Sequence, residues 1–197
     1  MTARALEKAT YADLLRVPDT LIAELIDGEL FTSPRPRASH SRAAGVVYAR
    51  TFGPYDHGID GPGGWWIFFE PELHLGDDVA IPDLAAWRRE RMPEYPSSHV
   101  FALAPDWVCE VLSPSTGRLD RGKKLPLYAR SGIGYAWVLN PDERYLEVRR
   151  LENGRWSVLC TYGGNDKVRA EPFPEAEIDL TLIWGFHAED DLPLPSP

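Results

Sequence analysis

A single acidic residue, Glu110, interrupts the apolar run Trp107-Val-Cys-Glu-Val-Leu112 of this 197-residue chain. The β-branched and aromatic residues of the run favour a buried strand. An ionised carboxylate is costly to bury unless it is paired, hydrogen-bonded or bound to a metal ion. The chain then turns at Ser113-Pro114 and enters a segment of helical pattern that contains Lys123 and Lys124. A buried acid at a strand end, followed by a lysine on the next helix, suits one half of a phosphodiester-cleaving site.

Asp83 is a second acid in an apolar setting. It follows Pro82 within residues 79–87, which we expect to form the strand that returns from a longer strand over residues 65–75. Proline has no N–H group, so the hydrogen-bond ladder must be broken at Pro82 or the strand must lie at a sheet edge. An acid beside a broken ladder is a candidate functional residue.

Two further acids lie on a predicted β-hairpin. Asp27-Gly28 between two apolar runs favours a tight turn, so residues 22–31 are expected to form the hairpin. With a two-residue turn, Glu24 and Glu29 share one face of it with Ile26 and Phe31. These acids are either ligands of a site or solvent-facing residues of an edge hairpin.

His40 stands at the entrance of a predicted helix over residues 42–52, for which Ser39 or Ser41 can serve as N-cap. The backbone N–H groups and the dipole at a helix start favour an anion. His40 is therefore a candidate for contact with a phosphate or for proton transfer, although a structural role is the alternative.

The lysine-bearing helix is predicted from Thr116 or Asp120 to Ser131, with Gly132 after its last turn. Pro126 requires that this helix start late or kink. Lys124 and Tyr128 are four residues apart and share a helix face, whereas Lys123 points about 100° away. Only one of the two lysines can therefore face a common site.

The remaining pattern predicts a short helix at residues 8–17 with Thr10 as N-cap, a buried strand at 134–139 and an antiparallel hairpin over 144–162. Together with the segments above, this pattern predicts a protein of mixed helices and strands with antiparallel hairpins. We expect one domain over residues 1–185 and an acidic, Pro-rich tail over residues 186–197.

Composition excludes several classes of protein. The chain is 44 % hydrophobic and 26 % charged, as in ordinary globular proteins, and it has no apolar run of the roughly 20 residues that cross a bilayer. Its start lacks the apolar stretch of a signal peptide, so a cytoplasmic location without membrane contact is expected. Cys109 and Cys160 are too few for a disulfide framework, and Cys109 is expected to pack in the core.

The net charge of −9 is unevenly distributed, because seven acids and no Lys or Arg follow Arg169. The acidic total therefore argues only weakly against a nucleic-acid partner, for which local basic clusters matter more. Two such clusters occur in the sequence, and a solvated polar surface is the alternative reading of each: Arg35, Arg37, Arg42 and Arg50, and then Arg118, Arg121, Lys123, Lys124 and Arg130.

In its order of motifs the chain resembles the Uma2-type (DUF820) family of restriction-endonuclease-like proteins, within the PD-(D/E)xK nuclease superfamily. The matching segments cover roughly residues 10–185: Glu24-Leu-Ile-Asp-Gly-Glu29-Leu, His40, Ile81-Pro-Asp83, Pro105-Asp-Trp-Val-Cys-Glu110-Val-Leu-Ser-Pro-Ser-Thr116, Asp120-Arg-Gly-Lys-Lys124-Leu-Pro-Leu-Tyr128-Ala-Arg-Ser-Gly132 and Tyr135-Ala-Trp-Val-Leu-Asn-Pro141. The resemblance implies an α+β fold with a restriction-endonuclease-like core of the α/β/α type, in which helices flank a central mixed β-sheet and extra antiparallel hairpins are attached. It also implies an endonuclease that acts on DNA.

One departure from the superfamily pattern concerns the lysine. Two residues beyond Glu110 stands Leu112, where the Glu-x-Lys motif has its lysine. The resemblance implies that the lysine has moved to the following helix, and Lys124 is favoured over Lys123 because it shares a face with Tyr128.

The implied chemistry is metal-assisted in-line hydrolysis of a phosphodiester. Asp83 and Glu110 would supply hard oxygen ligands to Mg²⁺, for which Mn²⁺ can substitute, and Lys124 would stabilise the charge that develops on the phosphoryl oxygens. Glu29 is the expected further acid of the metal site, and Glu24 and Glu72 are its alternatives. DNA versus RNA and sequence specificity stay open, because no base-reading motif is present.

Two other functions are kept as alternatives. A catalytically silent member could bind nucleic acid or a protein partner on the same scaffold, without needing Asp83, Glu110 and Lys124 together. An all-β ligand-binding module would fit the Trp- and Tyr-rich strands, but the helix between Glu110 and Tyr135 argues against it. A homodimer through a self-paired hairpin edge is a further expectation.

Overall fold

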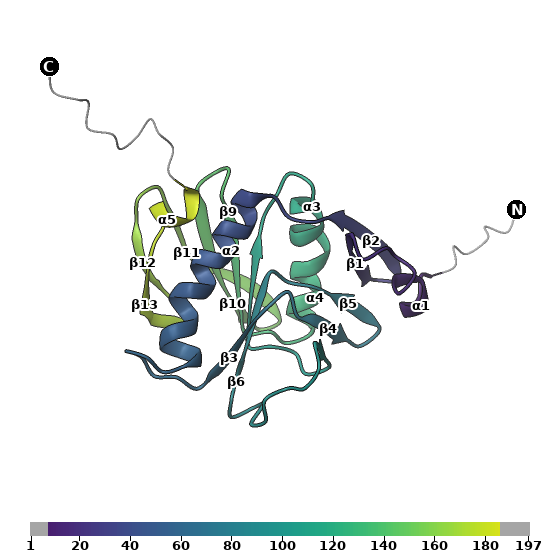
Figure 1. Ribbon diagram of the computed structural model, residues 1–197, viewed down its shortest axis with the longest axis horizontal. Helices are drawn as coiled ribbons and strands as arrows, with labels where there is room; N and C mark the ends of the chain where they lie inside the picture. The colour runs from purple at the N-terminus through teal and green to yellow at the C-terminus, as the bar shows by residue number, and fades with distance from the viewer. Residues whose placement is uncertain (1–7, 186–197) are drawn as a thin grey trace, which may run out of the picture.

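The computed structural model describes residues 8–185, so the predicted tail at 186–197 lies outside the described residues. The predicted α+β class is confirmed (Figure 1). A six-stranded mixed sheet forms the centre, and only β8 and β9 run parallel in it. Its strands, in spatial order, are β11 (Arg155–Gly163), β10 (Tyr145–Glu152), β9 (Tyr135–Asn140), β8 (Trp107–Val111), β6 (Leu84–Arg88) and β3 (Trp65–Phe69).

The central strand β8 contributes to two cores, one on each face of the sheet. Trp107, Cys109 and Val111 belong to the core that includes residues of helix α2 (Ala38–Thr51). Val108 and Leu112 belong to the core that includes residues of helix α4 (Leu125–Arg130). The predicted alternation along this strand, with Cys109 in the core, is therefore confirmed, and it directs the side chain of Glu110 toward the α4 side.

A second sheet has the order β2-β1-β5-β4-β7. Its strands are β1 (Leu21–Ile26), β2 (Glu29–Pro34), β4 (Glu72–Leu75), β5 (Asp78–Ala80) and β7 (Val100–Phe101). The predicted hairpin with its Asp27-Gly28 turn is confirmed, and Glu24 pairs with Phe31 as Ile26 pairs with Glu29. Helix α1 (Tyr11–Leu14) starts at the predicted cap Thr10 and lies beside this hairpin (Figure 1).

The prediction of one long strand over residues 65–75 is wrong. The chain forms β3 and β4 instead, and these belong to different sheets. The break falls at Glu70-Pro71, where Glu70 has a φ of 42° and proline cannot donate to a ladder. The returning segment is split in the same way between β5 and β6, so Asp83 lies in the joint between the two sheets.

Helix α2 begins two residues earlier than the predicted caps allow. Arg37 is the N-cap residue and makes no side-chain capping bond, so neither Ser39 nor Ser41 caps the helix. His40 consequently lies within the first turn of α2. The helix ends in the π-helical turn η1 (Phe52–Asp56), which begins at the predicted helix end, residue 52.

The lysine-bearing helix is built in three pieces: α3 (Gly117–Leu119), the π-helical turn η2 (Asp120–Lys124) and α4. The π turn directly precedes Pro126, which falls in the first turn of α4, so the regular α-helical pattern is interrupted next to the residue that cannot donate an N–H. Lys124 is the last residue of η2, at its junction with α4.

The C-terminal part of the described chain closes the α2 side of the sheet (Figure 1) with β12 (Lys167–Ala170), β13 (Phe173–Asp179) and α5 (Thr181–Trp184). Phe173 is fully buried and its ring lies 5.0 Å from those of Trp65 and Trp107. Within residues 8–185, none of the helices has the length and apolarity needed to cross a lipid bilayer.

Candidate active site

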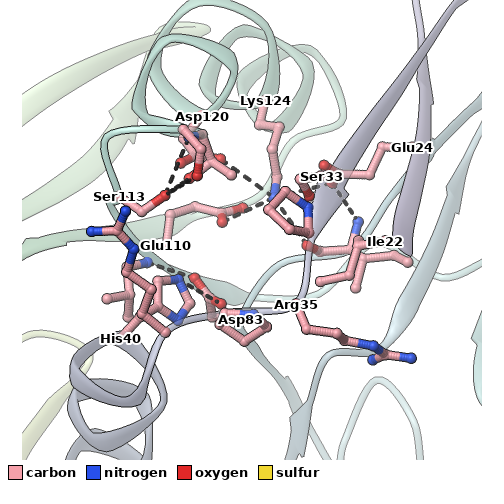
Figure 2. Close-up of a pocket in the computed structure, with 17 residues that line it drawn as sticks. Ile22, Glu24, Ser33, Arg35, His40, Asp83, Glu110, Ser113, Asp120 and Lys124 are labelled. Atoms are coloured by element: carbon pink, nitrogen blue, oxygen red, sulfur yellow. Dashed lines mark hydrogen bonds and ion pairs between the residues drawn. The ribbon is translucent and has the colours of Figure 1, made fainter. Parts of the chain in front are cut away.

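A cavity of about 180 Å³ lies where the β1–β2 hairpin, the joint between the sheets, the end of β8 and helix α2 meet. Figure 2 shows that charged side chains from all of these elements point into one region. Its lining includes four carboxylates, one lysine and one histidine: Glu24, Asp83, Glu110, Asp120, Lys124 and His40. The cavity is therefore rich in acidic oxygens, and we call it the acidic cavity.

Lys124 occupies the centre of the buried charges. Its Nζ lies 3.0 Å from Oε1 of Glu24 and 3.0 Å from Oε2 of Glu110, and it donates to the carbonyl oxygen of Ile81 at 2.9 Å. The ammonium thus donates hydrogen bonds to Ile81 and Glu110 and forms an ion pair with Glu24. Burial acts to lower the pKa of Lys124, but the charges of Glu110 and Glu24 outweigh it and raise that pKa well above its ordinary value. Lys124 is therefore held as a cation.

Glu110 is 2 % exposed and is held from two sides. Lys124 pairs with its Oε2, and the hydroxyl of Tyr128 donates to its Oε1 at 2.5 Å. Burial raises the pKa of Glu110 well above its ordinary value, Lys124 opposes this, and the nearby carboxylates Asp120 and Asp83 add to it. Lys124 and Tyr128, which are predicted to share a helix face, thus both contact the carboxylate of Glu110.

Asp83 is anchored to β8 next to Glu110. Its Oδ2 accepts the N–H of Val111 at 2.6 Å, and its Oδ1 lies 3.3 Å from Nε2 of His40. Burial acts to lower the pKa of His40, whereas the hydrogen bond and the charge of Asp83 raise it, and the net shift is upward. The joint between the sheets thereby places Asp83 between the first turn of α2 and the end of β8.

Asp120 is the fourth carboxylate of the acidic cavity. It lies 3.6 Å from Nζ of Lys124, one helical turn earlier in the chain. Burial raises the pKa of Asp120 to about 6, with Lys124 and a hydrogen bond from Thr116 opposing this shift. Glu24, Glu110 and Asp120 thus share one buried lysine, and Asp83 adds a fourth acid to the cavity, so acids outnumber cations among these side chains. A further cation would stabilise their charged forms.

The structure brings together Asp83, Glu110, Lys124 and His40 of the residues predicted from the sequence. It does not bring Glu29 to the acidic cavity, because this side chain is exposed and lies 3.5 Å from Nζ of the neighbouring Lys123.

Glu72, the other alternative acid, also lies elsewhere. It accepts a hydrogen bond from Tyr11 and contacts His74 at 2.6 Å, and it does not line the acidic cavity. Glu24 is the acid that meets Lys124, and it also accepts the N–H of Ile81 at 2.9 Å.

Sequence reasoning missed Asp120 as a member of the site. Its signal was available, because Asp120 precedes Lys124 by four residues on one helix face. Tyr128 was used only to choose between the lysines, although its hydroxyl holds Glu110.

The chemistry of the donor set fits a hard divalent cation. Asp83 and Glu110 lie on adjoining elements of one cavity, and carboxylate oxygens are the ligands that Mg²⁺ prefers. Within residues 8–185, no group of three acidic, histidine or cysteine side chains is arranged to hold a metal ion. Lys124 lies between two of the acids, Glu24 and Glu110. Mg²⁺ often binds through one or two carboxylates and keeps several waters, so two protein ligands are sufficient.

Comparison with known proteins shows the family and the fold of the chain. The sequence profile of the Uma2 family, described as "Putative restriction endonuclease", matches residues 9–182. A crystal structure described as "a putative nuclease belonging to DUF820 from Anabaena variabilis ATCC 29413" is similar, with a TM-score of 0.70 and 22 % sequence identity. The match covers 89 % of this chain and 97 % of that chain, which shows a common fold. A search of curated protein sequences gives no significant match.

Proposed function

Because the chain belongs to the Uma2 family, we propose that it is a metal-dependent endonuclease that hydrolyses phosphodiester bonds in DNA. The observation that carries this proposal is the convergence of Asp83, Glu110 and Lys124 on the acidic cavity. The three residues come from the sheet joint, a central strand and a helix, and a purely structural salt bridge does not need all three.

Asp83 and Glu110 would hold a divalent cation, Mg²⁺ or Mn²⁺, which when bound activates water and polarises a phosphate. Asp83 suits this role because one of its oxygens is fixed by the Val111 N–H while the other faces His40. Tyr128 orients Glu110 through its hydroxyl. The residues of the site are thereby held in place before substrate binds.

Lys124 would stabilise negative charge that develops on the phosphoryl oxygens. Its raised pKa keeps it charged at neutral pH. Glu24 positions it, because Oε1 of Glu24 both accepts the Ile81 N–H and pairs with the ammonium.

His40 would contact the substrate phosphate at the start of α2. It lies in the first helical turn, where free backbone N–H groups favour an anion. Its pKa is raised by Asp83, so a larger fraction of His40 carries a positive charge at neutral pH. A cytoplasmic location and a homodimer stay predictions from the sequence.

A catalytically silent binding module is the second candidate, and one observation favours it. Lys124 is engaged within the protein by Glu24, Glu110 and the Ile81 carbonyl oxygen, and Glu110 is held on both oxygens by Lys124 and Tyr128. A site whose groups are satisfied internally has to give up an ion pair in order to engage metal and phosphate.

Cleavage of end-labelled DNA distinguishes the two candidates. Wild-type protein and the Glu110→Gln variant would be incubated with linear single-stranded and double-stranded DNA in Mg²⁺, in Mn²⁺ and in EDTA. The endonuclease predicts internal cuts that require metal and that Glu110→Gln abolishes. Equal cutting by the variant would contradict the site, and no cutting in either metal, together with no Mn²⁺ binding by calorimetry, would favour the silent module.

A further inference from the structure

Three aromatic side chains, Phe69, Tyr48 and Phe52, pack in a row that ends at the sheet joint, and we call this row the aromatic shelf. Tyr48 and Phe52 are partly buried against the core, whereas Phe69 is exposed. Phe69 is the last residue of β3 and is 46 % exposed. Its ring centroid lies 4.4 Å from that of Tyr48, which in turn stacks on Phe52 at 4.6 Å. The Tyr48 ring therefore packs against Phe69 and leaves much of Phe69 open to solvent.

Backbone contacts connect Phe69 to the catalytic side of the sheet joint. Phe69 pairs across the sheet with Leu84, the residue that follows Asp83. The N–H of Glu70 donates to the carbonyl oxygen of Asp83 at 3.0 Å. The exposed ring thus belongs to the same corner of the fold as the proposed metal ligand.

Helix α2 provides a second connection. His40 in its first turn lies 3.3 Å from Asp83, and Tyr48 follows eight residues later. Eight residues of an α-helix rise about 12 Å. Tyr48 therefore lies about 12 Å along the helix axis from His40, which lines the acidic cavity.

Cations lie at the edge of the acidic cavity on this side. Arg35 and Arg37 line the cavity and are exposed. Figure 2 shows the side chain of Arg35 directed away from the buried charges around Lys124. Arg35 also lies 4.0 Å from Glu70, the residue that follows Phe69. A ligand that extends from the cavity to the shelf would meet guanidinium groups and then the flat face of an aromatic ring.

We propose that the aromatic shelf stacks a base of a single-stranded nucleic acid whose backbone passes through the acidic cavity. This inference rests on the proposed nuclease function and names its substrate class. Phosphates that contact cations, and bases that stack on aromatic rings, are the two contacts that single-strand-binding proteins combine. In a duplex the faces of the bases are covered by their neighbours, so a base could reach Phe69 only after being flipped out.

The charges at the cavity support the same substrate class. Arg35 and Arg37 line the cavity together with Glu24, Asp83 and Asp120, so phosphate contacts alone add little affinity there. Base stacking adds affinity that does not depend on net charge, and it is available only when the bases are unpaired.

Fluorescence anisotropy in EDTA, with labelled oligonucleotides of equal length, tests this inference without cleavage. The oligonucleotides are a single strand of mixed sequence, its duplex, and a fully abasic strand. The variants are Phe69→Ala and Phe69→Leu, the second of which keeps an apolar side chain but loses the flat ring. Val158→Ala, at another exposed apolar residue on β11, is the matched control.

We expect the wild type to bind the single strand at least about tenfold more tightly than the duplex. Loss of one stacked base costs roughly 1–3 kcal/mol, so Phe69→Ala should weaken single-strand binding roughly 5- to 150-fold. Phe69→Leu should lose most of the same affinity, Val158→Ala none, and abasic-strand binding should change less than twofold in every variant.

Equal affinity for the single strand and the duplex would overturn the inference, as would unchanged single-strand binding by Phe69→Ala. If sedimentation shows that the wild type self-associates and Phe69→Ala does not, the shelf contacts a second copy and the inference is also wrong. Failure here leaves metal-dependent cleavage untouched, and failure of cleavage leaves a binding result intact, so the two proposals can be separated.

Discussion

The Nζ atom of Lys124 lies 3.0 Å from a carboxylate oxygen of Glu110, although the two residues come from different elements and are 14 positions apart. In the Glu-x-Lys pattern the lysine follows its acid by two residues on one strand. Here that position is Leu112, which packs in the core, and the ammonium comes instead from Lys124 in the π-helical turn before α4. The same charges are thus brought together by tertiary packing instead of strand alternation.

Removing Lys124 should cost far more stability than removing its neighbour. Lys124→Met leaves three buried carboxylates without their cation, and breaking a buried pair in this way costs about 3–5 kcal/mol. Lys123→Met removes only partly exposed pairs with Asp27 and Glu29, worth about 1 kcal/mol or less. Urea denaturation of both variants measures the difference, and equal loss in the two would contradict the central position of Lys124.

Glu24 should matter for cleavage and Glu29 should not. Glu24→Gln keeps the shape of the side chain but removes the charge that pairs with Lys124. Loss of such an outer-shell partner typically lowers activity by about 10- to 100-fold. Glu29→Gln is the matched control on the same hairpin and should cleave within about twofold of wild type. Initial cleavage rates in Mg²⁺ test this, and a larger loss in Glu29→Gln would reverse the assignment.

Asp120 should impose a pH dependence on stability. Its pKa is raised to about 6, so the folded protein retains this proton where the unfolded chain, with an ordinary pKa near 3.8, releases it. The folded state is therefore destabilised by up to about 3 kcal/mol as pH rises from about 4 to about 6, with no further change above that range.

Asp120→Asn removes this titration, so the fall in stability between pH 4 and 6 should become shallower. The exposed Asp142→Asn serves as a control and should keep the wild-type slope. Thermal unfolding at several pH values measures both slopes. A wild-type slope in Asp120→Asn would show that other groups control this pH range.

Asp56 should protect the edge strand β3 from self-association. Its Oδ2 accepts the N–H of Ile67 at 2.9 Å, and Arg89 donates both to its backbone oxygen and to that of Trp65. Asp56→Ala frees an edge N–H, which should cost about 1–3 kcal/mol and expose a pairing edge. Denaturation and light scattering should show lower stability and larger particles for Asp56→Ala than for Asp142→Ala, whereas a monodisperse Asp56→Ala sample would argue against this role.

Local patterns were sufficient to predict the elements that carry the site. Alternation along residues 107–112 gave the correct face for Glu110, and helical spacing from Tyr128 favoured Lys124 over Lys123, as the contacts confirm. Both signals act within one element, where geometry follows directly from sequence spacing.

Features that depend on how elements dock were not predictable in this way. The hairpin register is as expected, and Glu24 and Glu29 do share a face, yet only one end of that face meets helix η2. The split of residues 65–75 between two sheets also depends on tertiary structure. Its signal in the sequence was Pro71, which cannot donate within a continuous ladder.

The rate of metal-started DNA cleavage by Asp83→Asn, relative to wild type, tests the central claim most directly. This substitution keeps the side-chain volume and removes one carboxylate of the proposed metal pair. Wild type and Asp83→Asn would first be shown to have equal melting temperatures in EDTA. Cleavage would then be started in both by adding Mg²⁺. We predict a rate at least about 100-fold lower. Loss of a residue that only orients a metal ligand costs up to about 100-fold, and loss of a ligand itself should cost at least as much. A ratio near one would contradict the metal site at Asp83 and Glu110, and with it the proposed mechanism.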